Sequence, residues 1–209
     1  MNITWSANIA YCVGLIATDG CLYSDGRHIC FTSKDSELIH SVIATFNLSS
    51  TIGHTVSGQT GKKTPRVQWS DKQLHHYLCS IGVTPNKSKT LESVKVPAQY
   101  FFDFLRGLFD GDGSFYSYKD KRFGTLLWYL TFNSASKAHI AWLRDRLQTI
   151  LGVTGHISKA MKSSVYSLRY GKKEGLQIIY KMYYSSQVPC LERKHQKIAQ
   201  VVKLVYTHP

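Results

Sequence analysis

The chain has 209 residues, of which 43% are hydrophobic, enough to bury one sizeable core or two closely packed halves of about a hundred residues each. Its 26 Lys and Arg residues against 13 acids give a formal charge of +13, which excludes a balanced surface and indicates a polyanionic partner such as nucleic acid. Residues 95–209 hold +11 of that charge, so the second half is expected to bind phosphate more strongly.

Two similar segments predict an internal duplication. Residues 11–22 read YCVGLIATDGCL and residues 104–115 read FLRGLFDGDGSF, so both contain Gly-Leu, an apolar position, a small residue and Asp-Gly. Asp19 and Asp112 occupy the same place in the two segments, 93 residues apart. Each segment is expected to be a helix that ends at its aspartate.

The first half is expected to continue with a hairpin over residues 21–33 that turns at Asp25-Gly26. An amphipathic helix follows, with apolar side chains at helical spacing: Leu38, Ile39, Val42, Ile43 and Phe46. Two short strands are predicted at residues 51–56 and 66–70, and a third helix at residues 72–81. This half therefore has the order α-β-β-α-β-β-α.

The second half repeats this order. A hairpin over residues 114–133 turns at residues 120–124, and the amphipathic helix carries Ile140, Leu143, Leu147, Ile150 and Leu151. Strands at 155–160 and 165–170, a helix at 173–184 and a last helix at 191–206 follow. We divide the chain into an N-terminal half (1–82), a linker (83–99) and a C-terminal half (100–209).

Small residues recur within each repeated segment. Gly14 and Thr18, and likewise Gly107 and Gly111, are four positions apart and so share one helix face, where another helix can approach closely. The two repeated helices are therefore expected to pack side by side. The glycines after the aspartates, Gly20 and Gly113, are predicted to take the left-handed conformation that ends a helix.

Each aspartate would then lie in a last helical turn, where the helix dipole opposes a carboxylate by about 0.3–1 kcal/mol. A shared cation would compensate, and two carboxylates beside exposed carbonyl oxygens suit Mg²⁺. Asp110 is an alternative acid, but it lies about 200° around the helix from Asp112, and its counterpart is Ala17. We expect Asp110 to be a polar support or a solvated acid.

The two motifs, GLIATDG at residues 14–20 and GLFDGDG at 107–113, resemble the signatures of the LAGLIDADG homing endonucleases in their single-chain form. The first motif departs from the family pattern at Ala17 and Thr18. The resemblance implies an α+β protein with the homing endonuclease fold, a tandem pseudo-two-fold repeat with two saddle-shaped antiparallel sheets. It also implies a monomer that cuts both strands of a long asymmetric double-stranded DNA site to leave 3′ overhangs.

The family's functional residues map onto this chain as expectations. Asp19 and Asp112 would bind Mg²⁺ and activate water, with carbonyl ligands from Thr18 and Gly111, and Mn²⁺ or Ca²⁺ could occupy the same site. A lysine near each scissile phosphate corresponds to Lys89, with Lys87 as the alternative, and to Lys194, with Arg193 as the alternative. Ser33 and Asn133 would order solvent, with Lys34 beside the first and Ser134 beside the second.

DNA would be read by side chains on one face of the hairpins, because alternate residues of a strand point the same way and each base pair presents a distinct pattern in the major groove. The candidates in the first half are Tyr23, Arg27, His28, Thr32, Lys34 and Gln68. Those in the second half are Tyr116, Tyr118, Lys121, Arg122, Trp128, Lys159, Lys162 and Arg169.

Two other functional classes stay open at this point. A non-cutting nucleic-acid binder, such as an intron maturase, would not need both aspartates. A small-molecule enzyme is disfavoured because no Gly-rich phosphate loop or metal-binding His spacing is present; His75 and His76 are adjacent and face different ways on a helix.

The remaining sequence features concern compartment. Five cysteines without a CxxC pair argue against a disulfide framework and against a zinc site. No signal peptide or membrane span is expected, because no basic region leads into an apolar run at the N-terminus and no apolar stretch is long enough to cross a bilayer. We expect an intracellular protein, in an organelle or in a prokaryotic cytoplasm.

Overall fold

The computed structural model of the chain describes residues 3–56, 58, 61–161 and 163–206. The elements of the first half are α1 (Ala7–Asp19), β1 (Gly20–Leu22), β2 (His28–Thr32), α2 (Ser36–Phe46), β3 (Gly53–Val56), β4 (Lys63–Ser70) and α3 (Lys72–Ser80). Those of the second half are η1 (Ala98–Tyr100), α4 (Phe101–Asp112), β5 (Ser114–Lys119), β6 (Leu126–Ser134), α5 (Lys137–Leu151), β7 (His156–Lys159), β8 (Tyr166–Tyr170), α6 (Lys172–Met182) and α7 (Glu192–Tyr206).

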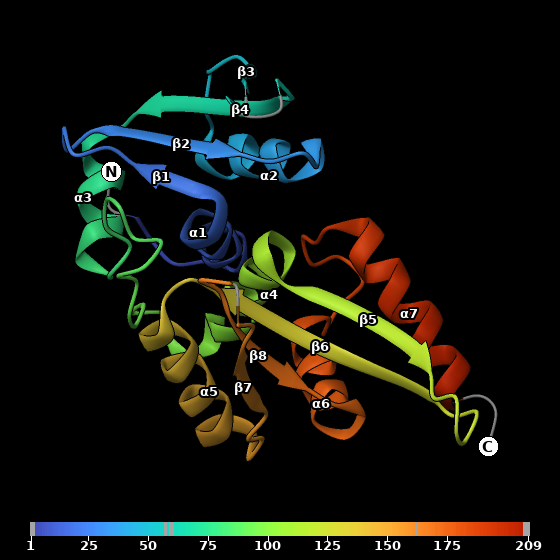
Figure 1. The fold of residues 1–209 in the computed structure, drawn as a ribbon. Coiled ribbons are helices and arrows are strands. Elements are labelled where there is room, and N and C mark those ends of the chain that lie inside the picture. The colour runs from blue at the N-terminus through green and yellow to red at the C-terminus, as the bar shows by residue number, and fades with distance from the viewer. Residues whose placement is uncertain (1–2, 57, 59–60, 162, 207–209) are drawn as a thin grey trace.

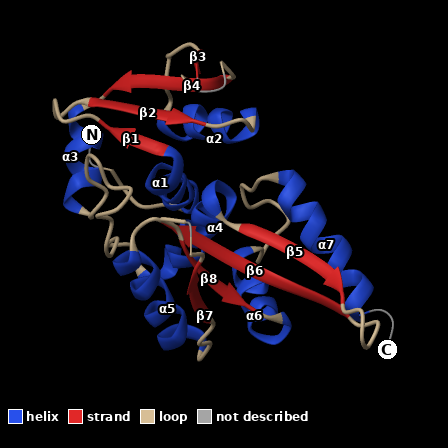
Figure 2. Ribbon diagram, viewed as in Figure 1, coloured by secondary structure: helices blue, strands red, loops and turns tan. Residues whose placement is uncertain are grey.

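Each half contains one four-stranded antiparallel sheet. The strand orders are β1-β2-β4-β3 and β5-β6-β8-β7, which are equivalent positions of the two repeats. Figures 1 and 2 show α1 and α4 side by side at the centre, with one sheet on each side of this pair. The predicted α+β class and tandem α-β-β-α-β-β-α repeat are confirmed. Within the described residues, none of the helices is long and apolar enough to cross a membrane.

The seam between α1 and α4 depends on glycine. A Cβ atom on Gly14 would lie 2.3 Å from the carbonyl oxygen of Phe104, and a Cβ on Gly107 would lie 2.1 Å from the carbonyl oxygen of Tyr11. The two helix backbones therefore touch, as the pattern of small residues predicts. One turn further on, a Cβ on Gly111 would overlap the hydroxyl of Thr18, at 2.0 Å.

The prediction that Gly20 and Gly113 are left-handed is wrong. Their φ angles are −85° and −73°, in extended backbone that leads directly into β1 and β5. Glycine is required there for space, because a Cβ would lie 2.7 Å from the Ile16 carbonyl oxygen in the first repeat and 2.6 Å from the Phe109 carbonyl oxygen in the second. Each helix can thus turn at once into the first strand of its sheet.

The core lies between each sheet and its helices. Alternate residues of the strands point into it, among them Ile29 and Phe31 of β2 and Leu130 and Phe132 of β6, which are at most 2% exposed. Side-chain oxygens cap helices that pack on the sheets; the Ser136 hydroxyl, for instance, accepts a hydrogen bond of 3.3 Å from the His139 amide at the start of α5.

The segment between the halves, residues 81–97, is packed onto the protein on both sides. The Ser136 hydroxyl donates to the Leu91 carbonyl, and the His139 Nδ1 lies 2.6 Å from the Glu92 carbonyl oxygen. On the side of the first half the Lys87 ammonium donates to the Gly20 carbonyl, and the Lys95 amide closes the segment on itself by donating to the Ile81 carbonyl over 2.8 Å. This connector is therefore held in place, and it can position side chains of its own.

Candidate active site

The two repeated aspartates lie at the ends of the central helix pair. Asp19 is the last residue of α1 and Asp112 the last of α4. The final carbonyls of a helix have no partner within it, so oxygen atoms are exposed beside each carboxylate. The seam thus brings two acids and two sets of helix-ending carbonyls to one end of the molecule's central pair.

A positive charge between Asp19 and Asp112 would stabilise the end of the α1–α4 helix pair. Burial and, next, the charge of Asp112 raise the pKa of Asp19 to about 6, and burial also raises the pKa of Asp112. Among the described residues, none of the ion pairs includes either acid. A divalent cation held by oxygen ligands is the group that would stabilise both carboxylates in the charged form.

The Asp19 cavity, at this end of the helix pair, has a volume of about 570 Å³. It is lined by Asp19, Ser33 and Lys34 from the first half and by Gly111, Gly113 and Lys194 from the second. This cavity therefore combines the acid of one repeat with a helix end and a lysine of the other.

The Asp112 cavity has the same composite character, in a volume of about 300 Å³. Its lining includes Asp112, Asn133 and Ser134 from the second half, with Thr18 and Lys87 contributed by the first half and the connector. The structure thus brings together both aspartates and both of the predicted carbonyl-bearing residues, and gives each acid a lysine from across the seam.

Lys194 is held by the end of α4. Its ammonium donates to the carbonyl oxygens of Phe109 (2.6 Å), Asp110 (2.9 Å) and Gly113 (2.7 Å). Burial lowers its pKa to about 8. The ammonium therefore satisfies helix-ending carbonyls and stays next to the Asp19 cavity. Arg193, the alternative in the sequence, instead forms a bidentate ion pair with Asp35, at 2.7 and 2.8 Å.

The lysine of the Asp112 cavity is Lys87, not Lys89. The Lys87 side chain is 5% exposed and its ammonium donates to the carbonyl of Gly20, whereas Lys89 points to solvent. Burial lowers the pKa of Lys87. The two lysines are two residues apart, and the turn formed by the packed connector decides which of them faces inward.

The two polar residues expected to order solvent have different partners. The Asn133 amide nitrogen donates to the Asp112 carbonyl over 2.8 Å, and its oxygen accepts from the Ser167 hydroxyl over 2.7 Å. Ser33, by contrast, is 7% exposed and accepts a hydrogen bond from the Asp35 amide over 3.1 Å. Asn133 is thus fixed against the end of α4, while Ser33 belongs to the turn before α2.

Asp110 is a buried polar support. It is 1% exposed, and one carboxylate oxygen accepts from the Tyr11 hydroxyl over 2.8 Å and from the Leu191 amide over 2.7 Å. Burial raises its pKa to about 6. Of the two expectations for this residue, the solvated acid is therefore wrong, and its role is to tie α1 and the start of α7 to α4.

The comparisons with known proteins agree with this geometry. Residues 101–183 match the model of the LAGLIDADG-like domain. This part of the chain is a LAGLIDADG-like domain. No curated protein matches the sequence.

Solved structures extend the LAGLIDADG fold to the whole chain. The homing endonuclease I-LtrWI bound to its target DNA is 12% identical, with a TM-score of 0.63 over 95% of this chain and 90% of that one. Mesophilic variants of the homing endonuclease I-DmoI are 20% identical, with a TM-score of 0.59 over 92% and 97%. I-DmoI has also been solved with its target DNA and Mg²⁺, and with DNA and Mn²⁺.

The fold also occurs outside proteins described as endonucleases. Full-length DUF199/WhiA from Thermatoga maritima is 18% identical, with a TM-score of 0.57 over 97% of this chain. The chain spans 63% of the length of that protein. At these identities the likeness establishes the LAGLIDADG fold, and function has to be argued from the residues of the site.

The solvent face of the first LAGLIDADG sheet carries polar side chains around Arg66. The Arg66 guanidinium donates to the Tyr23 hydroxyl and to the Gln68 amide oxygen. Arg66 was missed in the sequence, although it lies two residues before Gln68 on β4 and so shares its face. The other predicted residues of this half are exposed or half-buried: Arg27, His28, Thr32 and Lys34. Of these, His28 is held by Asp25 in the hairpin turn.

The solvent face of the second sheet is a stack of aromatic rings. Tyr129 stacks on Tyr116 at 5.4 Å and on Tyr118 at 6.2 Å between ring centroids, and the Arg169 guanidinium lies 5.4 Å from the Tyr129 ring. We call these four residues the tyrosine face. Tyr129 was missed in the sequence, because the choice between it and its neighbour depends on the register of β6.

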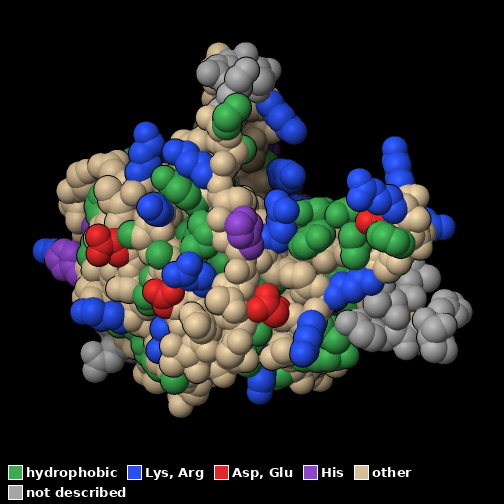
Figure 3. All heavy atoms as spheres, turned by 60° about the horizontal axis from the view of Figure 1, so that its bottom comes forward, with side chains coloured by type: hydrophobic (Ala, Val, Ile, Leu, Met, Phe, Trp, Pro, Cys, Tyr) green, Lys and Arg blue, Asp and Glu red, His purple; other side chains and the backbone are tan. Residues whose placement is uncertain are grey.

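The side chain of Trp128 does not lie on the solvent face of the second sheet. It is 1% exposed and packs on Phe115 at 5.2 Å between ring centroids, because its side chain points to the core side of β6. The predicted DNA contact is therefore wrong. Lys121 and Arg122 are exposed in the β5–β6 turn and Lys159 is exposed on β7, whereas Lys162 lies outside the described residues. Figure 3 shows one face of the molecule, on which Lys and Arg side chains are widespread and acids are few.

Proposed function

We propose that the chain is a site-specific, metal-dependent endonuclease that hydrolyses both strands of double-stranded DNA and leaves 3′ overhangs. The observation that carries this proposal is the convergence of Asp19 and Asp112 at the end of the α1–α4 seam, where the half-buried Lys194 of the second half lines the cavity of Asp19 and the buried Lys87 of the connector lines that of Asp112. Neither acid forms an ion pair among the described residues, although the chain carries 26 Lys and Arg residues.

The site fits a divalent cation. Asp19 and Asp112 would hold it, together with the backbone carbonyls of Thr18 and Gly111, which is an all-oxygen donor set suited to Mg²⁺, with Mn²⁺ and Ca²⁺ able to take the same ligands. When bound, the metal supplies a water of lowered pKa and charge neutralisation at the phosphate. The raised pKa of Asp19 supports this assignment, because a cation removes the repulsion that contributes to it.

The other groups of the site have roles that follow from their placement. The ammonium groups of Lys87 and Lys194 lie beside the cavities at fixed positions, where they can stabilise negative charge that develops on a scissile phosphate. Ser33 and Asn133 can accept or donate hydrogen bonds to solvent next to the acids. Desolvation of the two lysines strengthens their interaction with phosphate.

DNA binding is assigned to the solvent faces of the two sheets. Arg66, Gln68 and Tyr23 offer donors and acceptors to base edges in the first half, and the tyrosine face offers one guanidinium and three aromatic rings in the second. Because these surfaces differ, the target would be asymmetric as well as long. We divide the chain as residues 1–82 and 100–209, reading one half-site each, joined by residues 83–99 in a monomer.

The second candidate is a nucleic-acid-binding protein that does not cut, such as an intron maturase. The same fold and the same basic surface would serve it, so the fold does not distinguish the two functions. The two acids do, because carboxylates repel a polyanion, and a protein that only binds one gains nothing from placing two of them together.

The test is selection of cleaved molecules from a randomised double-stranded DNA pool with Mg²⁺. The proposal expects one family of long sites, cut on both strands, and no product with EDTA in place of the metal. The Asp19→Asn/Asp112→Asn double variant is the matched control, because it keeps the fold and the binding surface. Enrichment of bound but never cut DNA by the natural chain would favour the binding protein instead.

A further inference from the structure

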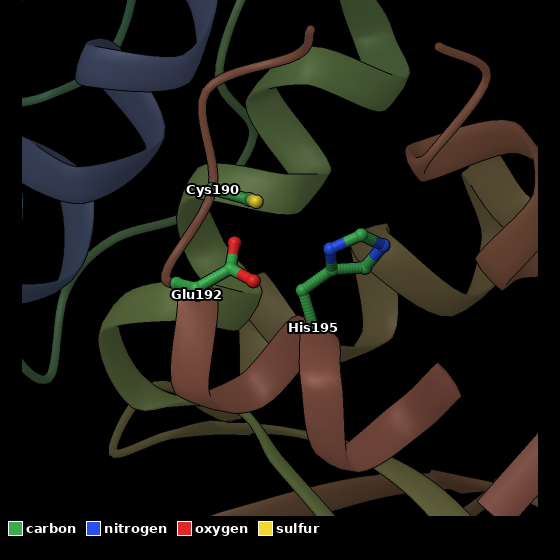
Figure 4. Close-up of side chains that lie close together, drawn as sticks. All are labelled: Cys190, Glu192 and His195. Carbon is green, nitrogen blue, oxygen red and sulfur yellow. The ribbon is translucent and has the colours of Figure 1, made fainter. Parts of the chain in front are cut away.

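A second group of metal-binding side chains lies at the start of α7. Cys190, Glu192 and His195 each offer one ligand atom, and these atoms all lie within 4.8 Å of one another. Figure 4 shows the three side chains facing one another, from the loop before α7 and from its first turn. Within the part of the chain that the structure describes, no other three His, Cys, Asp or Glu side chains are grouped in this way.

We propose that Cys190, Glu192 and His195 bind one Zn²⁺ ion, separately from the paired aspartates and independently of the proposed cleavage. A thiolate, an imidazole and a carboxylate are a donor set that selects Zn²⁺, whereas Mg²⁺ prefers oxygen ligands alone. Three protein ligands leave a fourth position for water. The absence of a CxxC pair therefore does not exclude zinc, because one cysteine suffices in a mixed set.

The three ligand atoms need to move only slightly closer together to bind one zinc ion. Tetrahedral zinc with ordinary bond lengths places a sulfur and a nitrogen or oxygen ligand about 3.5 Å apart. Glu192 is exposed, so its carboxylate can move by the remaining distance, and it lies three residues before His195 on the same face of the helix. One Glu192 oxygen already accepts from Gln196 over 2.9 Å, which leaves the other oxygen for the metal.

The surroundings favour a cation in spite of the basic composition of the chain. Three acids, Asp110, Glu192 and Glu37, act on the Cys190 sulfur together with the base Arg106. Zinc binding would replace the thiol proton, which is released to water as the metal–sulfur bond forms.

None of the three cluster residues lines the Asp19 cavity or the Asp112 cavity. His195 stacks on Tyr183 with ring centroids 4.6 Å apart, toward the end of α6, while the intervening Lys194 donates to the end of α4. A bound zinc would join the loop before α7 to its first turn. It would therefore clamp the segment that carries Lys194, without contributing a ligand to the Asp19 cavity.

The test is titration of the metal-free full-length chain with Zn²⁺ against a coloured chelator, and with Co²⁺ as a spectroscopic probe. We expect one equivalent of zinc per chain at this site and a thiolate-to-cobalt charge-transfer band. Cys190→Ser should remove the band, and Cys190→Ser and His195→Gln should each weaken zinc at least about 100-fold, more than the loss of an outer partner of a metal ligand.

Two controls make the result specific. Cys79→Ser removes a half-buried cysteine whose sulfur lies 3.8 Å from His75 Nδ1. Among the residues with described positions no third ligand joins these two, so the variant should keep both zinc and the band. Asp19→Asn/Asp112→Asn should also keep them. Thermal unfolding without metal checks that each variant is folded. If Cys190→Ser does not fold, the zinc affinity of His195→Gln tests the site instead.

The proposal is overturned by a chain that binds no zinc. It is equally overturned by zinc that is lost from the aspartate double variant but retained in both Cys190→Ser and His195→Gln. Because none of these readouts is cleavage, failure of the zinc site and failure of the proposed nuclease are distinguishable.

Discussion

The Asp19 cavity and the Asp112 cavity are built from the same repeat, yet they differ in size and in their surroundings. The first is about 570 Å³ and has Lys34 and the Asp35–Arg193 ion pair beside it, whereas the second is about 300 Å³ and has Asn133 bonded to the end of α4. The difference shows which parts of the site the seam dictates. The acids and lysines repeat, while the polar residues that would order solvent do not.

The same contrast holds for the two sheets. The first presents a guanidinium that bonds to polar neighbours, and the second presents a guanidinium over stacked tyrosines. Strand order and pairing are equivalent in the two halves, so the backbone has kept its symmetry while the side chains on the solvent faces have diverged. This is the arrangement that an asymmetric DNA target would select.

Among the differences between the two cavities that can be tested, substitution of their lysines should change the cleavage rate most. Lys194→Met should slow cleavage of the DNA strand that is cut at the Asp19 cavity, and Lys87→Met should slow cleavage of the strand that is cut at the Asp112 cavity. Each rate should fall about 10²–10³-fold, because a fixed positive charge near the scissile phosphate is lost. Strand-specific rates on an end-labelled duplex measure this. The matched control, Lys89→Met, should cut both strands at nearly the natural rate; a large loss there would restore Lys89 to the site.

The seam should be equally sensitive on its two sides. Gly14→Ala and Gly107→Ala each place a Cβ against a carbonyl oxygen of the partner helix, so each should lower the free energy of unfolding by about 3 kcal/mol or more. Urea denaturation measures both. Gly53→Ala, where a Cβ would lie 3.9 Å from the Arg66 carbonyl oxygen in ordinary van der Waals contact, should stay within about 0.5 kcal/mol of the natural chain. A mild cost at only one seam glycine would show that the two-fold packing is loose on that side.

The contribution of Asp19 to stability should depend on pH. The pKa of Asp19 in the folded, metal-free chain is raised to about 6, so the folded state holds its proton more tightly than the unfolded state. The contribution of Asp19 to stability therefore falls as pH rises from about 4 through about 6, by on the order of 1–2 kcal/mol after allowance for its partial exposure.

Comparison with Asp19→Asn isolates this effect, because the buried Asp110 and His139 titrate in both proteins. The variant should gain stability over the natural chain at about pH 7.5 but not at about pH 4.5, and Mg²⁺ should remove the difference. Equal stability of the two proteins at both values without metal would mean that Asp19 is not under electrostatic strain.

The smallest effect is expected for the ion pair that only the first cavity has. Arg193 is half-exposed, so its pairing with Asp35 should contribute only about 0.5 kcal/mol. A double-mutant cycle with Asp35→Asn and Arg193→Gln, followed by denaturation, measures the coupling. A coupling above about 2 kcal/mol would indicate that this pair, rather than the seam, fixes α7 to the first half.

The features that could be predicted from the sequence are those that depend on repetition and helical period. Asp19 and Asp112 stood out because they recur at one position, and the close approach of α1 and α4 followed from glycines four residues apart. Element order followed in the same way, because turn residues and alternating strands occur twice.

The side-chain positions that could not be predicted depend on the conformation of segments without regular secondary structure. Lys87 and Lys89 are two residues apart in a connector without regular structure, so only the packed turn decides which one is buried. Trp128 and Tyr129 face opposite sides of β6, and the register set by the long β5–β6 turn assigns them. Cys190 and His195 meet across the start of α7, which no spacing rule applied to the cysteines had indicated.

The central claim is that Asp19 and Asp112 together make the site of metal-dependent cleavage. The most direct measurement compares the natural chain, Asp19→Asn, Asp112→Asn and the double variant on a selected DNA site, recording binding in Ca²⁺ and double-strand cleavage in Mg²⁺. We expect that all four proteins bind the site and that only the natural chain makes both cuts. Double-strand cleavage by the double variant at the natural rate would contradict it.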